Sequence, residues 1–311
     1  MNYKQCAKSL LTHENILIVT HRNPDGDTVG SAAALCSALQ RGGRTAWMFP
    51  NEQINRKFRP FCEKFFAPEG FVPRYVVAVD TAEPELLSRG FAGPVDLCLD
   101  HHPSNSGYAK ESFVKPEKAA CAQIVLDVIR NMNGDVTKEE ATLLYIGLST
   151  DTGCFRYSNT DAACFRAASE LLHNGADSET INTVFFRKSS AARLKLESMV
   201  YDRMRSYRDG KIVFALITKE MLAASGVQEE DMDDLASLAS RVEGGELAIT
   251  IREGEEGQCK VSVRSSDAVS SNEICAVFGG GGHMRAAGCT IKGSPEKVCE
   301  MLLNVIDEVW K

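Results

Sequence analysis

The sequence predicts an α/β protein with two domains: an N-terminal domain built on a parallel sheet and a smaller C-terminal α/β domain. Apolar, β-branched runs without polar alternation alternate with helix-forming stretches, which is typical of a parallel sheet covered on both faces. The 311 residues exceed one typical domain. After the turn signal at residues 208–210, expected strands follow one another with a single helical segment between them. This change of pattern places the domain boundary between Arg187 and Arg208.

The elements expected in the N-terminal domain follow from short local signals. A helix over residues 27–40 begins at a capping aspartate and ends at Gly42-Gly43. The expected strands cover residues 16–20, 45–49, 75–79 and 96–99. Further helical patterns cover residues 119–132, 138–149, 161–174, 178–186 and 191–207. In the C-terminal domain we expect strands at residues 211–217, 247–252 and 258–264, and an acidic helical segment at 228–241.

Composition narrows the class of protein. A net charge of −7 argues against a charge-driven binder of long nucleic acid, but leaves room for a local basic pocket. The 11 cysteines include no CxxC pair and lie mostly in apolar runs, so we expect reduced, buried thiols. The polar N-terminus shows no signal peptide, and no apolar stretch is long enough to span a bilayer. We expect a cytoplasmic protein with no membrane partner.

The tripeptide Asp100-His101-His102 directly follows an apolar strand, and it holds two of the six histidines. Imidazole and carboxylate together suit Mn, Fe, Co or Zn rather than Ca. A strand that ends in these residues places them at the carboxyl edge of the sheet, where open α/β folds build their sites. Taken alone, the triplet is equally compatible with a charged surface loop.

Three other segments carry acidic residues in comparable places. They are His21-x-Asn23-x-Asp25-x-Asp27 after the first strand, Asp80 after the third, and Asp151 at the end of a helix. So many carboxylates at one edge would repel one another unless neutralised, and two divalent cations achieve this. Each segment has a plainer interpretation: a satisfied loop histidine, a turn, or a helix cap. Because the segments share one edge of the sheet, the common metal site is the better interpretation.

This set of motifs resembles the DHH phosphoesterase superfamily, whose members are Mn-dependent. The segment 279–288, Gly-Gly-Gly-Gly-His-Met-Arg-Ala-Ala-Gly, resembles the DHHA1 substrate domain of that family. The resemblance covers the whole chain and is strongest to the stand-alone branch of nanoRNases and pAp phosphatases. It implies a DHH catalytic, metal-binding domain at 1–190, a helical linker at 191–208 and a DHHA1 substrate-binding domain at 209–311, with the active site in the cleft between the domains.

The resemblance also implies roles for individual residues. One Mn²⁺ would be held by His21, Asp25 and Asp80, and the second by Asp27, Asp80, His101 and Asp151, with Asp80 bridging. Asp100 would orient the ring of His101. His102 would face the phosphate as a charge stabiliser or as proton donor to the leaving oxygen. Asn23 would reach a phosphoryl oxygen.

The glycine-rich segment predicts a phosphate clamp. Four glycines in a row are costly to order and do not favour a regular element, but their bare amides can surround an anion. His283 and Arg285 follow at once, and Arg264 ends an expected strand. A guanidinium binds phosphate through two parallel hydrogen bonds. We therefore expect substrate contacts from Arg264, Gly281, Gly282, His283 and Arg285. By itself, the glycine run is more typical of a flexible hinge beside a surface arginine, and the phosphate clamp becomes the better interpretation only with His283, Arg285 and the resemblance to the family segment.

The reaction expected from the resemblance is phosphoester hydrolysis by metal-activated water. Its substrates would be short oligoribonucleotides, cut to mononucleotides, and 3′-phosphoadenosine 5′-phosphate (pAp), which would lose its 3′-phosphate. Long nucleic acid is not an expected partner. The alternatives are a phosphodiesterase for cyclic dinucleotides or their linear products, an inorganic pyrophosphatase, and a non-catalytic nucleotide-binding sensor. A homodimer through helices of the N-terminal domain is compatible with the sequence.

Overall fold

The computed structural model describes residues 1–232, 234–266 and 268–310, and it divides into two compact units, Met1–Lys188 and Ser189–Lys311. The first unit contains a parallel sheet of five strands in the order β2-β1-β3-β4-β5. These strands are β1 (Ile16–Val19), β2 (Ala46–Met48), β3 (Tyr75–Val79), β4 (Leu97–Asp100) and β5 (Glu111–Val114). The strand order reverses between β1 and β3, which is where open α/β sheets bind ligands.

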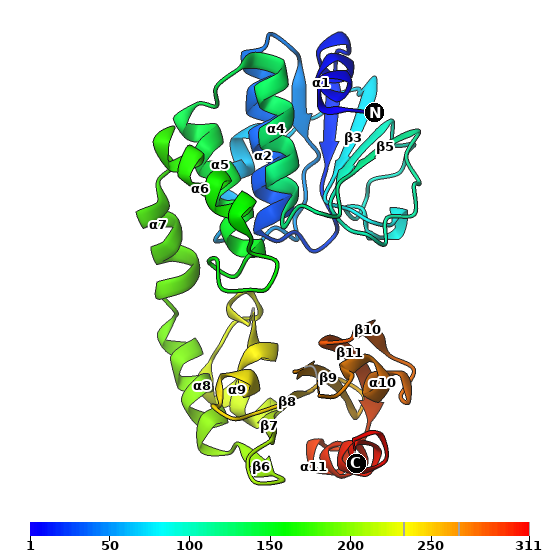
Figure 1. Ribbon diagram of the computed structural model, residues 1–311, viewed down its shortest axis with the longest axis vertical. Coiled ribbons are helices and arrows are strands. Elements are labelled where there is room, and N and C mark those ends of the chain that lie inside the picture. Colours follow the sequence, from blue (N-terminus) through cyan, green and yellow to red (C-terminus); the bar gives the residue numbers. More distant parts are fainter. Residues whose placement is uncertain (233, 267, 311) are drawn as a thin grey trace. The chain divides into compact units, whose positions relative to one another are not determined.

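Helices cover one face of this sheet (Figure 1). They are α1 (Tyr3–Thr12), α2 (Gly26–Arg41), α4 (Cys121–Asn133), α5 (Lys138–Asp151) and α6 (Ala162–His173), and their apolar sides form the main core with the strands. The opposite face packs against loop residues, including Phe71, Phe91 and Tyr108. Shorter elements complete the unit: α3 (Arg59–Cys62), η1 (Glu63–Phe65), η2 (Pro84–Leu86), α7 (Ser178–Asn182) and the π-helical turn η3 (Thr183–Arg187).

The second unit contains a mixed sheet of six strands in the order β10-β11-β9-β8-β7-β6, in which only β7 and β8 run parallel. The strands are β6 (Arg205–Tyr207), β7 (Ile212–Ile217), β8 (Leu247–Glu253), β9 (Gln258–Ser265), β10 (Gly281–His283) and β11 (Ala286–Lys292). Helices α10 (Ser271–Ala276) and α11 (Pro295–Val309) cover one face. Helices α8 (Ala191–Asp202) and α9 (Lys219–Ser225) cover the other. The predicted α/β class, with a parallel sheet followed by a smaller α/β unit, is confirmed.

Two local expectations need correction, and two further elements were not expected. The helix expected to reach residue 207 ends at Asp202, and residues 205–207 form β6 because they pair antiparallel with β7. The acidic segment 228–241 forms short 3-10 turns, η4 (Glu229–Asp231), η5 (Leu235–Ser237) and η6 (Ala239–Arg241), instead of one helix. Helix α1 and strand β5 were not expected, because the first is polar and the second is mostly exposed.

All the cysteines are free, and all except Cys154 are buried, as expected for reduced thiols inside apolar runs. Within the described ranges, no helix combines the length and the apolar character needed to cross a membrane.

Candidate active site

The loop after β1 positions the first predicted ligands by capping α2. Asp25 is the N-cap of this helix, and its Oδ1 accepts hydrogen bonds from the backbone N–H groups of Asp27 (3.0 Å) and Thr28 (3.1 Å). The backbone of His21 is held from the other side, because its carbonyl accepts a hydrogen bond from Nδ2 of Asn51 at 3.1 Å. The plainer interpretation of Asp25 as a helix cap is therefore correct. In this capping position, Oδ1 of Asp25 also lies 3.6 Å from Nε2 of His21.

Asp27 is buried against the start of α4. Its Oδ2 accepts the backbone N–H of Cys121 at 2.6 Å, and its Oδ1 accepts that of Ala122 at 2.9 Å and the hydroxyl of Ser31 at 3.2 Å. Helix α4 has no side-chain cap of its own, since its N-cap residue is Ala120. Asp27 thus satisfies amides that a helix start leaves unpaired, and its carboxylate oxygens lie at the positive end of the helix dipole.

Close packing of α2 against α5 brings Asp151 to this edge of the sheet. A Cβ on Gly30 would lie 2.3 Å from the carbonyl oxygen of Leu143, and one on Gly147 would lie 2.7 Å from Oδ1 of Asp27. Only glycine permits such an approach at these two positions. Because α5 ends at Asp151, this contact decides where the Asp151 carboxylate lies: its Oδ2 is 3.7 Å from Nε2 of His101.

Asp80 lies at the centre of the cluster. It follows β3 with a left-handed backbone (φ 57°), an uncommon conformation for a residue with a side chain, and it is 3% exposed. Its Oδ2 is 3.8 Å from Nε2 of His21, and its Oδ1 is 3.4 Å from Nε2 of His101. Within the described chain, Oδ1 is buried without a hydrogen-bond partner. A buried carboxylate oxygen that lacks a donor is costly, and a cation between Asp80 and the histidines would satisfy it.

The two histidines of the triplet have different partners. Nδ1 of His101 donates to the carbonyl oxygen of Lys118 at 3.2 Å, so that Nε2 faces Asp80. Nδ1 of His102 donates to Oδ1 of Asp100 at 2.7 Å. The expectation that Asp100 orients the ring of His101 is therefore wrong. Of His101, Asp100 binds only the backbone N–H, at 2.8 Å, and the ring that its buried carboxylate holds is that of His102.

The predicted metal ligands lie together in overlapping groups, each with donor atoms within 4.8 Å of one another. The groups are His21, Asp25 and Asp80; Asp27, His101 and Asp151; and Asp80, His101 and His102. The mixture of imidazole and carboxylate donors fits a borderline divalent cation. Asp80 faces both of the first two groups, which is the arrangement expected of a bridging ligand.

Closely spaced carboxylates dominate the electrostatics of the cluster. Burial and the neighbouring charges of Asp80 and Asp151 raise the pKa of Asp27 well above its usual range. Burial, with Asp80 adding to it, raises the pKa of Asp151 to about 7. Burial lowers the pKa of His101, but the carboxylates of Asp80, 3.4 Å from Nε2, and of Asp27 outweigh this and raise the pKa to about 10. The raised pKa values of Asp27 and Asp151 express burial and mutual repulsion of carboxylates, which a bound divalent cation would relieve, and the raised pKa of His101 expresses its attraction to the same carboxylates.

A cavity of about 420 Å³ opens on these groups. Its lining includes predicted site residues from all the carboxyl-edge segments: His21, Asn23, Asp25, Asp80, His101, His102 and Asp151. Asp27 and Asp100 are buried behind this surface.

The sequence did not single out Arg22, Thr81, Glu83 and Ser104, which also line the cavity. The position of Arg22 between His21 and Asn23 was the available signal. Within the described residues, the guanidinium of Arg22 forms no hydrogen bond or ion pair.

The predicted substrate-binding residues belong to the second unit. Gly281, Gly282 and His283 form the exposed edge strand β10, which pairs with β11. Arg264 lies near the end of β9, opposite Ala286. The expectation of an irregular glycine segment is wrong for β10. A Cβ on Gly282 would lie 2.5 Å from the carbonyl oxygen of Ala286, so close pairing with β11 requires glycine there.

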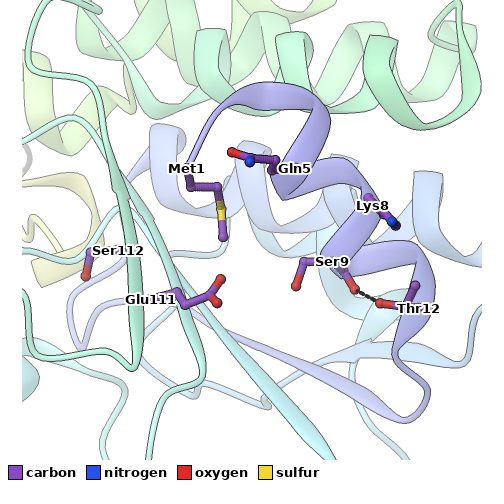
Figure 2. A pocket seen from close by; sticks show the side chains of 7 residues that line it. All are labelled: Met1, Gln5, Lys8, Ser9, Thr12, Glu111 and Ser112. Atoms are coloured by element: carbon purple, nitrogen blue, oxygen red, sulfur yellow. Dashed lines mark hydrogen bonds between the residues drawn. The ribbon is translucent and has the colours of Figure 1, made fainter.

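A separate depression of about 640 Å³ lies between α1 and β5 (Figure 2). Its lining consists of Met1, Gln5, Lys8, Ser9, Thr12, Glu111 and Ser112. These side chains include no histidine or aspartate, and the one hydrogen bond drawn among them joins Thr12 to the backbone of Ser9. The residue types of this lining do not indicate a metal site or a site of phosphoester hydrolysis.

Comparison with known proteins identifies the family. Residues 15–148 match the DHH family, N-terminal domain, and residues 209–311 match the DHHA1 domain. The bifunctional oligoribonuclease and PAP phosphatase NrnA of Thermus thermophilus is 36% identical over 300 residues, covering 94% of this chain and 89% of that protein. An exopolyphosphatase-related protein from Bacteroides fragilis shares the fold with a TM-score of 0.85 and 22% identity, over 98% of this chain and 96% of the other.

RecJ of Thermus thermophilus, solved in complex with Mn²⁺, shares the fold with a TM-score of 0.56 and 16% identity, over 98% of this chain and 54% of the other. The resemblance predicted from the motifs is thereby confirmed. The chain belongs to the DHH family of phosphoesterases, with a DHHA1 domain after the DHH domain, and is a hydrolase of phosphoester bonds.

Proposed function

We propose that this enzyme uses two Mn²⁺ ions to hydrolyse short oligoribonucleotides to mononucleotides and to remove the 3′-phosphate of pAp. The observation that carries the proposal is the position of Asp80 between two groups of ligands, with one carboxylate oxygen facing His21 and the other facing His101. The substrates are proposed from the relative of Thermus thermophilus that bears both activities in its name.

The residues present fit two divalent cations. One would be held by His21, Asp25 and Asp80, and the other by Asp27, Asp80, His101 and Asp151, all groups whose donor atoms lie close together. Cations held by these residues would supply a water of lowered pKa and would neutralise charge on the phosphoryl oxygens. The donors suit a borderline divalent cation, and manganese is the proposed ion because RecJ of Thermus thermophilus, which shares the fold, was solved in complex with Mn²⁺.

The other polar groups of the cavity are assigned to the substrate. His102 is tied to Asp100 through Nδ1, so its Nε2 is the nitrogen available to a phosphoryl or leaving oxygen. Asn23 offers an amide donor from the same lining. Arg22 offers a guanidinium without a partner in the described chain, and this group can bind a phosphate through two parallel hydrogen bonds. In the second unit, Arg264, His283, Arg285 and the amides of Gly281 and Gly282 remain the proposed anion-binding groups.

Preference for short substrates is supported by charge and by size. The net charge of −7 disfavours a long polyanion. A cavity of about 420 Å³ has the size of a small-molecule site rather than of a channel for a long strand.

The test is a substrate panel with the Mn²⁺-loaded enzyme. Di- to pentaribonucleotides, a long RNA, pAp, a cyclic dinucleotide and inorganic pyrophosphate are incubated separately, and released nucleotide and phosphate are quantified. We expect mononucleotides from the short oligomers and AMP from pAp, with little product from the long RNA. Equal turnover of long RNA would overturn the length preference, and turnover of the cyclic dinucleotide or pyrophosphate alone would replace the proposed substrates.

A variant of the shared ligand tests the metal assignment. Asp80→Asn removes the negative charge shared by both groups and replaces one of the two facing oxygens by NH₂. We therefore expect kcat to fall by more than about 100-fold, which exceeds the loss seen when a residue that only supports a metal ligand is removed. Asp135→Asn is the matched control, because Asp135 is an exposed aspartate of the same unit outside the cluster. Activity of Asp80→Asn equal to that of Asp135→Asn would refute the shared site.

A further inference from the structure

Asn105, a residue outside every predicted motif, contacts the carboxylate that holds His102. Its Nδ2 donates to Oδ2 of Asp100 at 2.6 Å and to the carbonyl oxygen of Thr81 at 3.3 Å. Its Oδ1 accepts the backbone N–H of Gly107 at 2.9 Å, and its own backbone N–H donates to the carbonyl of His102 at 3.2 Å. The side chain is therefore anchored at both ends of its amide group.

These partners leave one orientation for the amide of Asn105. The groups around Nδ2 are acceptors, namely the Asp100 carboxylate and the Thr81 carbonyl, and the group facing Oδ1 is a donor. A flipped amide would set its oxygen against two oxygens and its NH₂ against an N–H group. The network itself thus assigns the NH₂ group to the side of Asp100.

The hydrogen bonds of Asp100 are divided unequally between its two oxygens. Oδ1 accepts the backbone N–H groups of His101 (2.8 Å) and His102 (3.2 Å) and Nδ1–H of the His102 ring (2.7 Å). Among the described residues, Oδ2 accepts its hydrogen bond from Asn105. Asp100 is 0% exposed, with Asn105 in contact with its Oδ2. Loss of the Nδ2 donor would remove the hydrogen bond that the described protein supplies to Oδ2 and would free the carboxylate to rotate.

We propose that Asn105 is a positioning residue. By its hydrogen bond to Oδ2 of Asp100, it keeps Oδ1 in place to accept the hydrogen bond from Nδ1 of His102. The His102 ring then presents Nε2 to the substrate phosphate. The assignment of a phosphate to His102 rests on the proposed function. The hydrogen bonds from Asn105 to Asp100 and from His102 to Asp100 do not depend on the proposed function, and they can be observed without turnover. Asn105 touches none of the predicted metal ligands through its side chain.

The test uses two variants of the full-length enzyme, with kinetics and NMR on each. Asn105→Asp keeps the shape and replaces the NH₂ donor by oxygen, whereas Asn105→Ala removes the donor without adding charge. The control is Gln40→Ala, which deletes a half-buried side-chain amide bonded to the carbonyl of Ala46 at 2.8 Å, away from the cluster. Melting temperature and Mn²⁺ affinity are measured for all proteins, so that a folding defect is recognised.

In ¹⁵N-labelled wild-type protein, Nδ1–H of His102 should appear as a slowly exchanging signal. It should weaken or vanish in both Asn105 variants and persist in Gln40→Ala. With pAp, kcat of both variants should fall by about 10- to 100-fold, the usual cost of losing a residue that orients a functional side chain, and KM should change little. An unchanged Nδ1–H signal or unchanged kcat in a folded Asn105 variant would overturn the proposal. Absence of turnover by the wild type, with the NMR result as expected, would instead refute the proposed function.

Discussion

Asp27 and Cys121 are joined by a hydrogen bond of 2.6 Å, from the first backbone N–H of α4 to Oδ2 of a predicted metal ligand. The other oxygen of Asp27 accepts the N–H of Ala122. One carboxylate therefore serves both as the cap of a distant helix and as part of the candidate metal cluster. Removing it should lower both the free energy of unfolding and the affinity for metal.

Asp27→Ala should lower the stability of the metal-free protein. It leaves two buried N–H groups of α4 without an acceptor, at a cost of about 1–3 kcal/mol each before relaxation. Asp151→Asn is the comparison: it also removes a carboxylate of the cluster, but no hydrogen bond to the Asp151 side chain is present within the described chain. It should be neutral or stabilising, because repulsion is relieved. Urea unfolding without metal checks both variants; a less stable Asp151→Asn and an unaffected Asp27→Ala would contradict this account.

Gly147→Ala should damage the cluster without changing any polar group. The new Cβ would lie 2.7 Å from Oδ1 of Asp27 and 2.8 Å from Cβ of Ala122, so α5 must move away from α2. Overpacking of this kind costs about 1–3 kcal/mol, and here it also displaces Asp151. Gly93→Ala is the control, since its Cβ would meet only the Phe91 ring at 3.6 Å. Calorimetric melting and Mn²⁺ titration should show loss for Gly147→Ala alone.

Metal binding should release protons and should strengthen with pH. In the metal-free protein the pKa of His101 is raised to about 10 and that of Asp151 to about 7, so the cluster retains protons at neutral pH. A cation binds the deprotonated ligands, so its binding expels these protons and is favoured as pH rises from 6 to 8. Mn²⁺ titration calorimetry in buffers of different ionisation enthalpy measures the number released. Binding that is independent of both buffer and pH would show that the cluster is already deprotonated.

Arg22→Ala should weaken substrate binding more than it slows the chemical step. The guanidinium lines the cavity without a partner in the described part of the molecule, and its backbone is fixed by a hydrogen bond of 2.6 Å to the carbonyl of Leu86. Losing a charge-assisted hydrogen bond to phosphate costs roughly 1.5–3 kcal/mol of binding free energy, which corresponds to an increase in KM of about 10- to 100-fold. Arg166→Ala, an exposed arginine on α6, is the control. A fall in kcat alone would contradict a binding role.

Much of the fold was predictable because the signals are local. The runs at residues 16–20 and 75–79 are apolar and β-branched, and they became the central strands β1 and β3. Strand β5 was missed because its residues are mostly exposed at the sheet edge, and β6 because only pairing with β7 makes it a strand. Segment 228–241 was overestimated as a helix, since its pattern is satisfied by short 3-10 turns over β8.

The sequence by itself determined the kinds of donor in the cluster and the edge of the sheet that carries them, because parallel strands end at one edge and each motif directly follows its strand or helix. Only the tertiary structure decided the partners. Asp100 pairs with His102 rather than His101, Asn105 supports it, and Asp27 caps a helix that begins 94 residues later. Such contacts depend on the directions of side chains and on how closely α2 and α5 approach, and packing between distant segments sets both.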